Sequence, residues 1–247
     1  FLTRFHIRED AIWIEDINEL SNSELTDMCR LLDEYSLWGT RAGDTHAQKM
    51  RYLRKSCHAE MKNIMLDLLK SQNMHRKIKQ LLDTLFENND IKEITLLLFI
   101  CNTISVDIDL NDILILLNKQ AKSSAVIHNQ NIREFFDFRR NRVEIKSPLV
   151  AYYVLKTGKY DRDVERLLLT VLPVLDRNSH ISNYRNALRM LISYSNLQMI
   201  FGGKSKAVFE RYERIFERAK NLNYHRQNTF FWLQYAIVRM EMKQYKS

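Results

Sequence analysis

Glycine and proline are scarce in this 247-residue chain, which contains only 5 Gly and 2 Pro. Tight turns are most often built from these two residues, because they supply the special backbone angles that turns require. Their scarcity argues against an all-β fold and against a Rossmann-type α/β fold, both of which need many turns. This composition therefore favours helices joined by short polar loops.

Cysteines and long apolar runs are scarce as well. The three cysteines, Cys29, Cys57 and Cys101, are odd in number and far apart, and each lies within an apolar helical pattern. We expect buried thiols in a reducing cytoplasm and no disulfide framework. The apolar runs stop well short of the roughly 18 residues that indicate a membrane span, so no membrane contact is predicted.

Motifs for catalysis and metal binding are also lacking. The seven histidines show no ligand spacing with cysteines or carboxylates, and no serine or cysteine has the surroundings of a nucleophile. Gly203, Lys204 and Ser205 match the end of a phosphate-binding loop, but the first glycine of that loop would fall at Gln198. We expect no enzyme activity, no metal and no cofactor in these residues themselves.

Basic residues are plentiful: 38 Lys and Arg face 30 Asp and Glu, for a net charge of +8. One dense basic cluster lies on a long helix predicted at residues 46–70, on the side opposite its apolar positions. The cluster contains Lys49, Arg51, Arg54, Lys55 and Lys62. It is a candidate contact to phosphate or to an acidic partner, and the alternative is an ordinary solvated helix face.

A β-hairpin followed by a helix is predicted at residues 135–155. Phe136 and Phe138 alternate with polar residues, and a polar turn separates them from a returning strand. Ser147 and the proline after it then supply the start of a helix. A modest positive tip of three arginines is a further candidate contact to phosphate or a partner: Arg139, Arg140 and Arg142.

The predicted fold is mainly α. Residues 1–72 form an N-terminal helical segment with a strand at 12–14 and a helix that begins at a capping box of Ser21 and Glu24. Residues 73–157 form a winged-helix-like module whose wing is the hairpin. Residues 158–247 form an α-solenoid-like array that resembles tetratricopeptide repeats. Its helices are predicted at about 161–175, where Pro173 kinks or ends the helix, and at about 182–201, 205–220 and 227–245. Glu210 and Arg214 stand four residues apart on the third of these helices and are a predicted ion pair. The third helix of the module, predicted at 112–120, is too apolar to read a DNA groove, so we expect it to be buried in a structural joint.

Two stretches resemble the middle of a bacterial STAND-class P-loop NTPase, a class of nucleotide-switched signalling ATPases that includes antiphage sensors. Residues 138–151, FRRNRVEIKSPLVA, are similar to the wing strand and following helix of the winged-helix domain in that class. Residues 228–236, NTFFWLQYA, are similar to the opening of the helical sensor array that comes next.

The resemblance implies a non-catalytic region that couples a nucleotide-binding core, upstream of residue 1, to ligand sensing by the helices after it. The complete protein would bind ATP or ADP with Mg²⁺, self-associate on activation and recognise a protein ligand in antiviral defence. In this class, the junction between wing and helix often carries a histidine that touches the nucleotide phosphate. Lys146 and Ser147 occupy the matching positions here and are candidate nucleotide contacts, because either side chain at a helix N-terminus can meet a phosphate.

A second interpretation makes no use of a nucleotide. The chain would then be a basic helical adaptor that binds nucleic acid or a protein partner without switching. Steep salt dependence of binding to nucleic acid would distinguish this adaptor from the coupling region. Because the chain starts without Met and stops within a helical pattern, we also expect it to be a piece of a longer protein.

Overall fold

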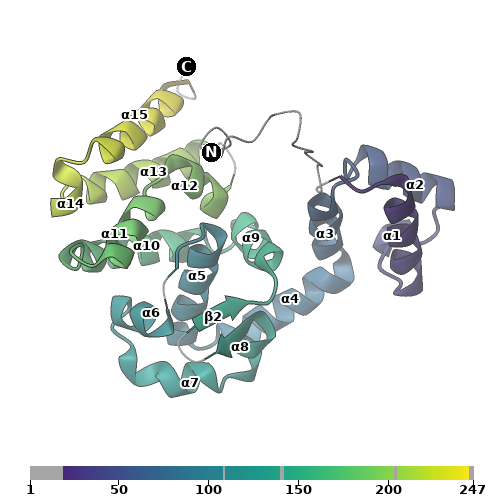
Figure 1. The fold of residues 1–247 in the computed structure, drawn as a ribbon, viewed down its shortest axis with the longest axis horizontal. Coiled ribbons are helices and arrows are strands. Elements are labelled where there is room, and N and C mark those ends of the chain that lie inside the picture. The colour runs from purple at the N-terminus through teal and green to yellow at the C-terminus, as the bar shows by residue number, and fades with distance from the viewer. Residues whose placement is uncertain (1–18, 108, 140–141, 203–204, 245–247) are drawn as a thin grey trace, which may run out of the picture. The chain divides into compact units, whose positions relative to one another are not determined.

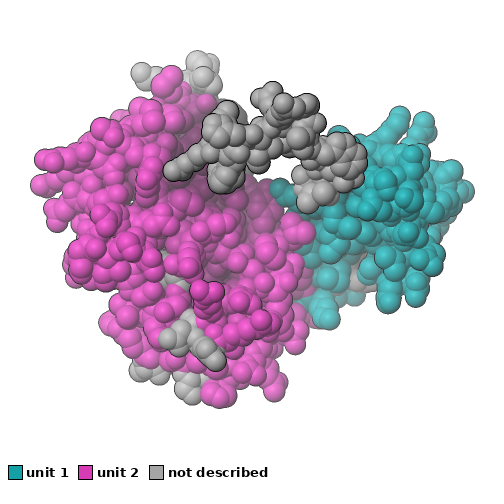
Figure 2. Space-filling model, viewed as in Figure 1, with its two compact units in different colours: residues 1–77 teal, residues 78–247 magenta. Residues whose placement is uncertain are grey.

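The computed structural model describes residues 19–107, 109–139, 142–202 and 205–244. These residues are mainly helical, with one two-stranded antiparallel hairpin, so the predicted mainly α class is confirmed. The chain divides into two compact units, 1–77 and 78–247, and the boundary falls within one helix (Figure 2). The strand predicted at residues 12–14 lies outside the described residues, as do Arg140, Asn141, Gly203 and Lys204.

The first unit has a small helical core. Its elements are α1 (Asn22–Glu34), η3 (Gly39–Arg41), α2 (His46–Lys55), α3 (Met61–Lys70) and the start of α4 (Gln72–Leu85). Helix α1 begins with a capping box in which the Ser21 and Glu24 side chains each bond the other residue's backbone N–H, as the sequence predicts. Leu25, Leu53 and Ile64 meet in the core.

The long helix predicted at residues 46–70 is wrong, because the chain breaks between α2 and α3. His58 and Ala59 both adopt left-handed backbone angles, with φ of 55°. The Ala59 carbonyl accepts a hydrogen bond of 2.7 Å from the Leu20 N–H, which joins the break to the start of α1. Cys57 is buried at the break. The helical spacing of apolar residues therefore continues across the break, and the sequence gives no sign that the chain changes direction there.

The second unit is built around α5 (Asn89–Thr103), which is buried from Ile94 to Cys101. Figure 1 shows α5 surrounded by α6, α9 and α10, and all three contact it. The other elements in chain order are α6 (Leu110–Leu116), η4 (Gln120–Lys122), α7 (Ser123–Ile127), α8 (Gln130–Phe135), β1 (Phe136–Arg139), β2 (Arg142–Ile145), α9 (Pro148–Lys156), α10 (Asp161–Arg177), α11 (Ser182–Leu191), α12 (Tyr194–Phe201), α13 (Lys206–Ala219), α14 (Asn223–Arg226) and α15 (Thr229–Gln244).

The predicted hairpin is confirmed as β1 paired with β2. Phe136 pairs with Ile145, and Phe138 pairs with Val143. Phe136 is 1% exposed and lies against Phe99 of α5, while the Lys146 N–H donates to the Phe135 carbonyl at the base of the hairpin. An isolated two-stranded hairpin is only marginally stable in water, so this packing against α5 is what holds it in place.

The helix that directly precedes the hairpin is α8, which corrects the expectation of a third helix at residues 112–120. Residues 112–116 of that segment form most of α6, which stops at Leu116, and they are apolar and buried at Ile113 and Leu114 as expected. Two further short helices, α7 and α8, follow where the sequence shows no clear pattern. Asn129 caps α8 by accepting a hydrogen bond from the Ile132 N–H.

The C-terminal helices lie in successive layers, with α15 at the outer edge in Figure 1. Helix α10 passes through Pro173, where the sequence predicts a kink or an end, and continues to Arg177. The single helix predicted at residues 182–201 is wrong, since α11 and α12 are separate helices. Leu233 and Met240 are exposed on α15 at 58% and 66%. Within the described ranges, no helix is both long and apolar enough to cross a bilayer.

Candidate functional site

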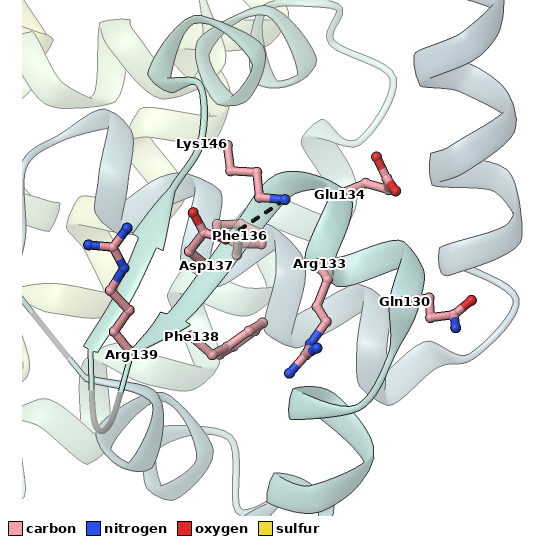
Figure 3. A pocket seen from close by; sticks show the side chains of 8 residues that line it. All are labelled: Gln130, Arg133, Glu134, Phe136, Asp137, Phe138, Arg139 and Lys146. Atoms are coloured by element: carbon pink, nitrogen blue, oxygen red, sulfur yellow. Dashed lines mark ion pairs between the residues drawn. The ribbon is translucent and has the colours of Figure 1, made fainter.

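An open pocket of about 550 Å³ lies between α8 and β1, and we call it the hairpin pocket (Figure 3). It combines residues from α8, from β1 and from the residue that follows β2. Its lining residues are Gln130, Arg133, Glu134, Phe136, Asp137, Phe138, Arg139 and Lys146. Two of the predicted candidate residues, Arg139 and Lys146, therefore meet at one surface.

Local structure explains how α8 presents its polar residues to this pocket. Ile132 and Phe135 are buried on the inner side of the helix. Gln130, Arg133 and Glu134 stand at helical spacing on the other side, where all three are exposed. The burial of two apolar residues thus fixes the orientation of the polar wall.

The hairpin pocket carries charges of both signs. The Lys146 Nζ lies 3.8 Å from the Asp137 Oδ1, and the Arg139 Nη1 lies 3.6 Å from the Glu144 Oε2. These side chains are half-exposed or more, so each pair contributes at most about 1 kcal/mol. Figure 3 shows Lys146 directed toward Asp137, with Arg133 and Arg139 on opposite sides of Phe138. Such a surface suits a polar protein partner of mixed charge.

The predicted nucleotide contacts differ in position. Lys146 lines the hairpin pocket, whereas Ser147 is the N-cap residue of α9 and makes no side-chain capping bond. A nucleotide phosphate fits these surroundings poorly, because Asp137 pairs with the Lys146 ammonium and Glu134 adds a second carboxylate. The nucleotide contact stays a prediction, and no step of the proposed function depends on it.

The remaining residues at the tip of the hairpin are only partly described. Arg142 pairs with Arg139 across the two strands and is exposed, but it does not line the hairpin pocket. Arg140 lies outside the described residues. A joint role for the three arginines stays a prediction.

The basic cluster on α2 is smaller than the sequence indicates. Arg51, Arg54 and Lys55 are exposed, as expected of a contact surface. Lys49 is a correction: it is 6% exposed, its Nζ donates to the Asp33 Oδ1 at 2.6 Å, and it lies over the Trp38 ring. The reason is that Lys49 faces α1, where a carboxylate and an aromatic ring stabilise its ammonium.

A second surface, which the sequence analysis missed, lies between α10 and α13. We call it the arginine groove; it has a volume of about 580 Å³ and is lined by Arg162, Glu165, Arg166, Leu169, Thr170, Arg214 and Arg218. Arg214 bonds Glu165 through two nitrogens, at 2.5 and 2.9 Å, rather than pairing with Glu210 one turn away. These two hydrogen bonds lower the pKa of the Glu165 carboxyl. The signal in the sequence is a pair of arginines four residues apart on each of the two helices.

Groups that often serve catalysis or metal binding are scattered in this structure. Among the described residues, no three His, Cys, Asp or Glu side chains gather where they could hold a metal ion. All three thiols are buried, and burial raises the pKa of Cys101 to about 12. The His225 ring is buried, neither of its nitrogens has a hydrogen-bond partner among the described residues, and desolvation lowers the pKa of His225 to about 4.

The chain was compared with known proteins by sequence and by structure. No protein-family model, no curated protein and no solved structure matches it. The function is therefore argued from the geometry of the hairpin and its surroundings together with the resemblance of residues 138–151 and 228–236.

Proposed function

We propose that this chain is the non-catalytic coupling region of a STAND-class signalling ATPase that acts in antiviral defence in the cytoplasm. In this proposal, a nucleotide-binding core precedes the chain and binds ATP or ADP with Mg²⁺. Residues 73–157 form a winged-helix module, and residues 158–247 form a tetratricopeptide-like array that senses a protein ligand. A run of short helices, α5 to α8, directly followed by two paired antiparallel strands supports the winged-helix assignment.

One observation carries the proposal: α9 joins the hairpin to the helical array. Only Lys146 and Ser147 separate β2 from α9. Helix α9 then packs against both α5 and α12, and the Lys156 Nζ donates to the Gln198 carbonyl of α12. A displacement of the array would therefore be transmitted through one short helix to the hairpin.

The mechanism that follows is a two-state joint. The hairpin is anchored through Phe136 at its base, while Arg142 and Glu144 of β2 and the following Lys146 are exposed. A ligand that binds the array more tightly in one arrangement shifts the balance between a resting and a self-associated form by its difference in affinity. No bond is made or broken by the residues of this chain.

The test uses the complete protein that contains this chain. We expect a G-x-x-x-x-G-K-[ST] loop after a strand upstream of residue 1, binding of a fluorescent ATP analogue, and an increase in mass on activation, measured by mass photometry. Lys156→Ala should leave ATP binding unchanged and alter the change in mass, because it removes the bond from α9 to α12. A complete protein that neither binds ATP nor changes mass would refute the proposal.

A second candidate function is a basic adaptor, and the exposure of Arg51, Arg54 and Lys55 on α2 favours it. Among the described residues, none of these three has a carboxylate partner within 4.0 Å. We expect an adaptor to bind duplex or single-stranded nucleic acid with a steep salt dependence, which Arg51→Glu with Lys55→Glu should weaken. If this double variant binds as wild type does, the cluster is a solvated helix face.

A further inference from the structure

The arginine groove follows two neighbouring helices that run in the same direction. Residue numbers rise together along the contacts between α10 and the segment that contains α13 and the start of α14. The contacts are Asp161 with Arg211, Glu165 with Arg214, and Asp176 with Asn223. Each helix contributes two arginines four residues apart to the groove, namely Arg162 and Arg166 from α10 and Arg214 and Arg218 from α13. Two guanidinium groups therefore line each side of the groove.

Positive charge exceeds negative charge in this groove. Glu165 is the one carboxylate among its lining residues, and it is bonded to Arg211 and Arg214. Arg166 lies near the carboxylates of Glu93 and Asp163. Among the described residues, Arg162 and Arg218 have no such carboxylate within 4.0 Å, and both are exposed. Two guanidinium groups thus remain available to an acidic partner.

The position of Arg162 does not serve the stability of α10. It lies in the first turn of the helix, where the macrodipole disfavours a cation. Arg218 lies in the last turn of α13, where the macrodipole favours one. A cation at position 162 is therefore not explained by the stability of α10, but it is explained if the groove binds a negatively charged partner.

The chemistry of the lining favours a peptide over a nucleic acid. Guanidinium groups bind carboxylates through two parallel hydrogen bonds. Leu169, another lining residue, offers an apolar contact, whereas no aromatic side chain of the described residues lines the groove to stack on a base.

We infer that the arginine groove binds an acidic peptide segment of a partner protein, with its carboxylates on Arg162 and Arg218 and an apolar side chain on Leu169. This inference goes beyond the coupling function and is independent of it. The groove is complete within the second unit, and its binding requires neither a nucleotide nor a switch.

The experiment measures the fluorescence anisotropy of a labelled acidic peptide in which several glutamates stand on each side of a leucine. The 247-residue chain is titrated against this peptide, against the same peptide with glutamine for glutamate, and against labelled oligothymidine. The test variant is Arg162→Glu with Arg218→Glu. The matched control is Arg185→Glu with Arg226→Glu, which changes two exposed arginines of the same unit outside the groove by the same charge.

We expect the test variant to weaken binding of the glutamate peptide at least about tenfold, since two charge-assisted hydrogen-bonding groups are lost. The control variant should bind within about twofold of wild type, and the glutamine peptide should bind weakly to all three proteins. Circular dichroism checks that the variants keep their helix content. Equal binding by the test and control variants, or loss confined to oligothymidine, overturns the inference.

Discussion

The ring of Phe136 in β1 lies against the ring of Phe99 in α5, with centroids 5.3 Å apart and the planes tilted by 31°. Both side chains are essentially inaccessible to solvent. This contact joins the hairpin to the most deeply buried helix of the second unit. The hairpin is consequently part of the core at its base and open to partners at its edges.

The first prediction concerns this aromatic contact. Phe136→Ala should lower the free energy of unfolding by about 3 to 5 kcal/mol, because a large buried ring is replaced by a cavity. Phe138→Ala is the matched control, since Phe138 lies in the same strand but is only half-buried, and it should cost less. Urea unfolding followed by circular dichroism measures both values. Equal losses for the two variants would show that the base of the hairpin is not anchored in the core.

The second prediction concerns a buried carboxylate that holds the start of α14. Asp176 accepts hydrogen bonds of 3.0 and 2.9 Å from the backbone N–H groups of Asn223 and Tyr224. Asp176→Ala should cost about 1 to 3 kcal/mol, because two buried donors lose their acceptor. Asp176→Asn, which keeps one oxygen acceptor, should cost less. Chemical unfolding ranks the two variants, and an alanine variant as stable as wild type would contradict the assignment.

The third prediction concerns pH and His225. Desolvation lowers the pKa of His225 to about 4 from its ordinary value of 6.5, so the neutral form is favoured in the folded state. In the unfolded chain His225 takes up a proton near its ordinary pKa, whereas in the folded chain it does so only near pH 4. The stability that neutral His225 contributes is therefore present above the ordinary pKa and is lost as the pH falls from there toward 4. Between pH 7 and pH 5 the loss should be about 2 kcal/mol.

His225→Phe tests this dependence without removing the aromatic contact to Phe231, whose ring stacks on that of His225 at 4.7 Å. The variant should show a shallower decline of the unfolding free energy between pH 7 and pH 5 than wild type. The negative charge of Asp176 raises the pKa of His225 and so partly opposes the effect of desolvation. Measuring the same two pH profiles in an Asp176→Asn background therefore provides a second comparison. Identical pH profiles for wild type and His225→Phe would rule out His225 as the titrating group.

The fourth prediction concerns Gly202, which ends α12 with a left-handed φ of 67°. A Cβ atom there would lie 2.8 Å from the Lys156 Cδ. Gly202→Ala should therefore cost about 1 to 2 kcal/mol, mostly from the backbone angle, because the lysine side chain can move aside. Gly43→Ala is the control, since a Cβ there meets no atom within 4 Å, and thermal unfolding compares the two. A loss for both variants alike would point to a general effect of adding a methyl group.

Local patterns in the sequence were sufficient for some elements of this fold. The capping box of Ser21 and Glu24, and the alternation of Phe136 and Phe138, each involve residues close together in the chain. Features decided by distant contacts were not predictable in the same way. The break at His58 and Ala59 depends on a hydrogen bond to Leu20, and the burial of Lys49 depends on Asp33.

The candidate surfaces also divide into one that residues close in the chain indicate and one that depends on contacts between distant residues. The sequence indicates Arg139 and Lys146 as exposed hairpin residues, and the strand pairing brings them to one pocket. The arginine groove requires α10 and α13 to lie side by side, and no pattern within either helix specifies its neighbour. Arg214 illustrates the point, because the predicted partner Glu210 lies one turn away while the observed partner Glu165 belongs to another helix.

The burial of Cys29, Cys57 and Cys101 makes this chain well suited to site-directed spin labelling. These are its only cysteines, and inaccessible thiols react slowly with maleimide or methanethiosulfonate reagents. Cysteines introduced at Arg142 on the hairpin and at Arg218 on α13 would therefore take up nitroxide labels selectively. Electron paramagnetic resonance would then measure the distribution of distances between the two labels. A narrow distribution would mean that α9 connects these two positions stiffly.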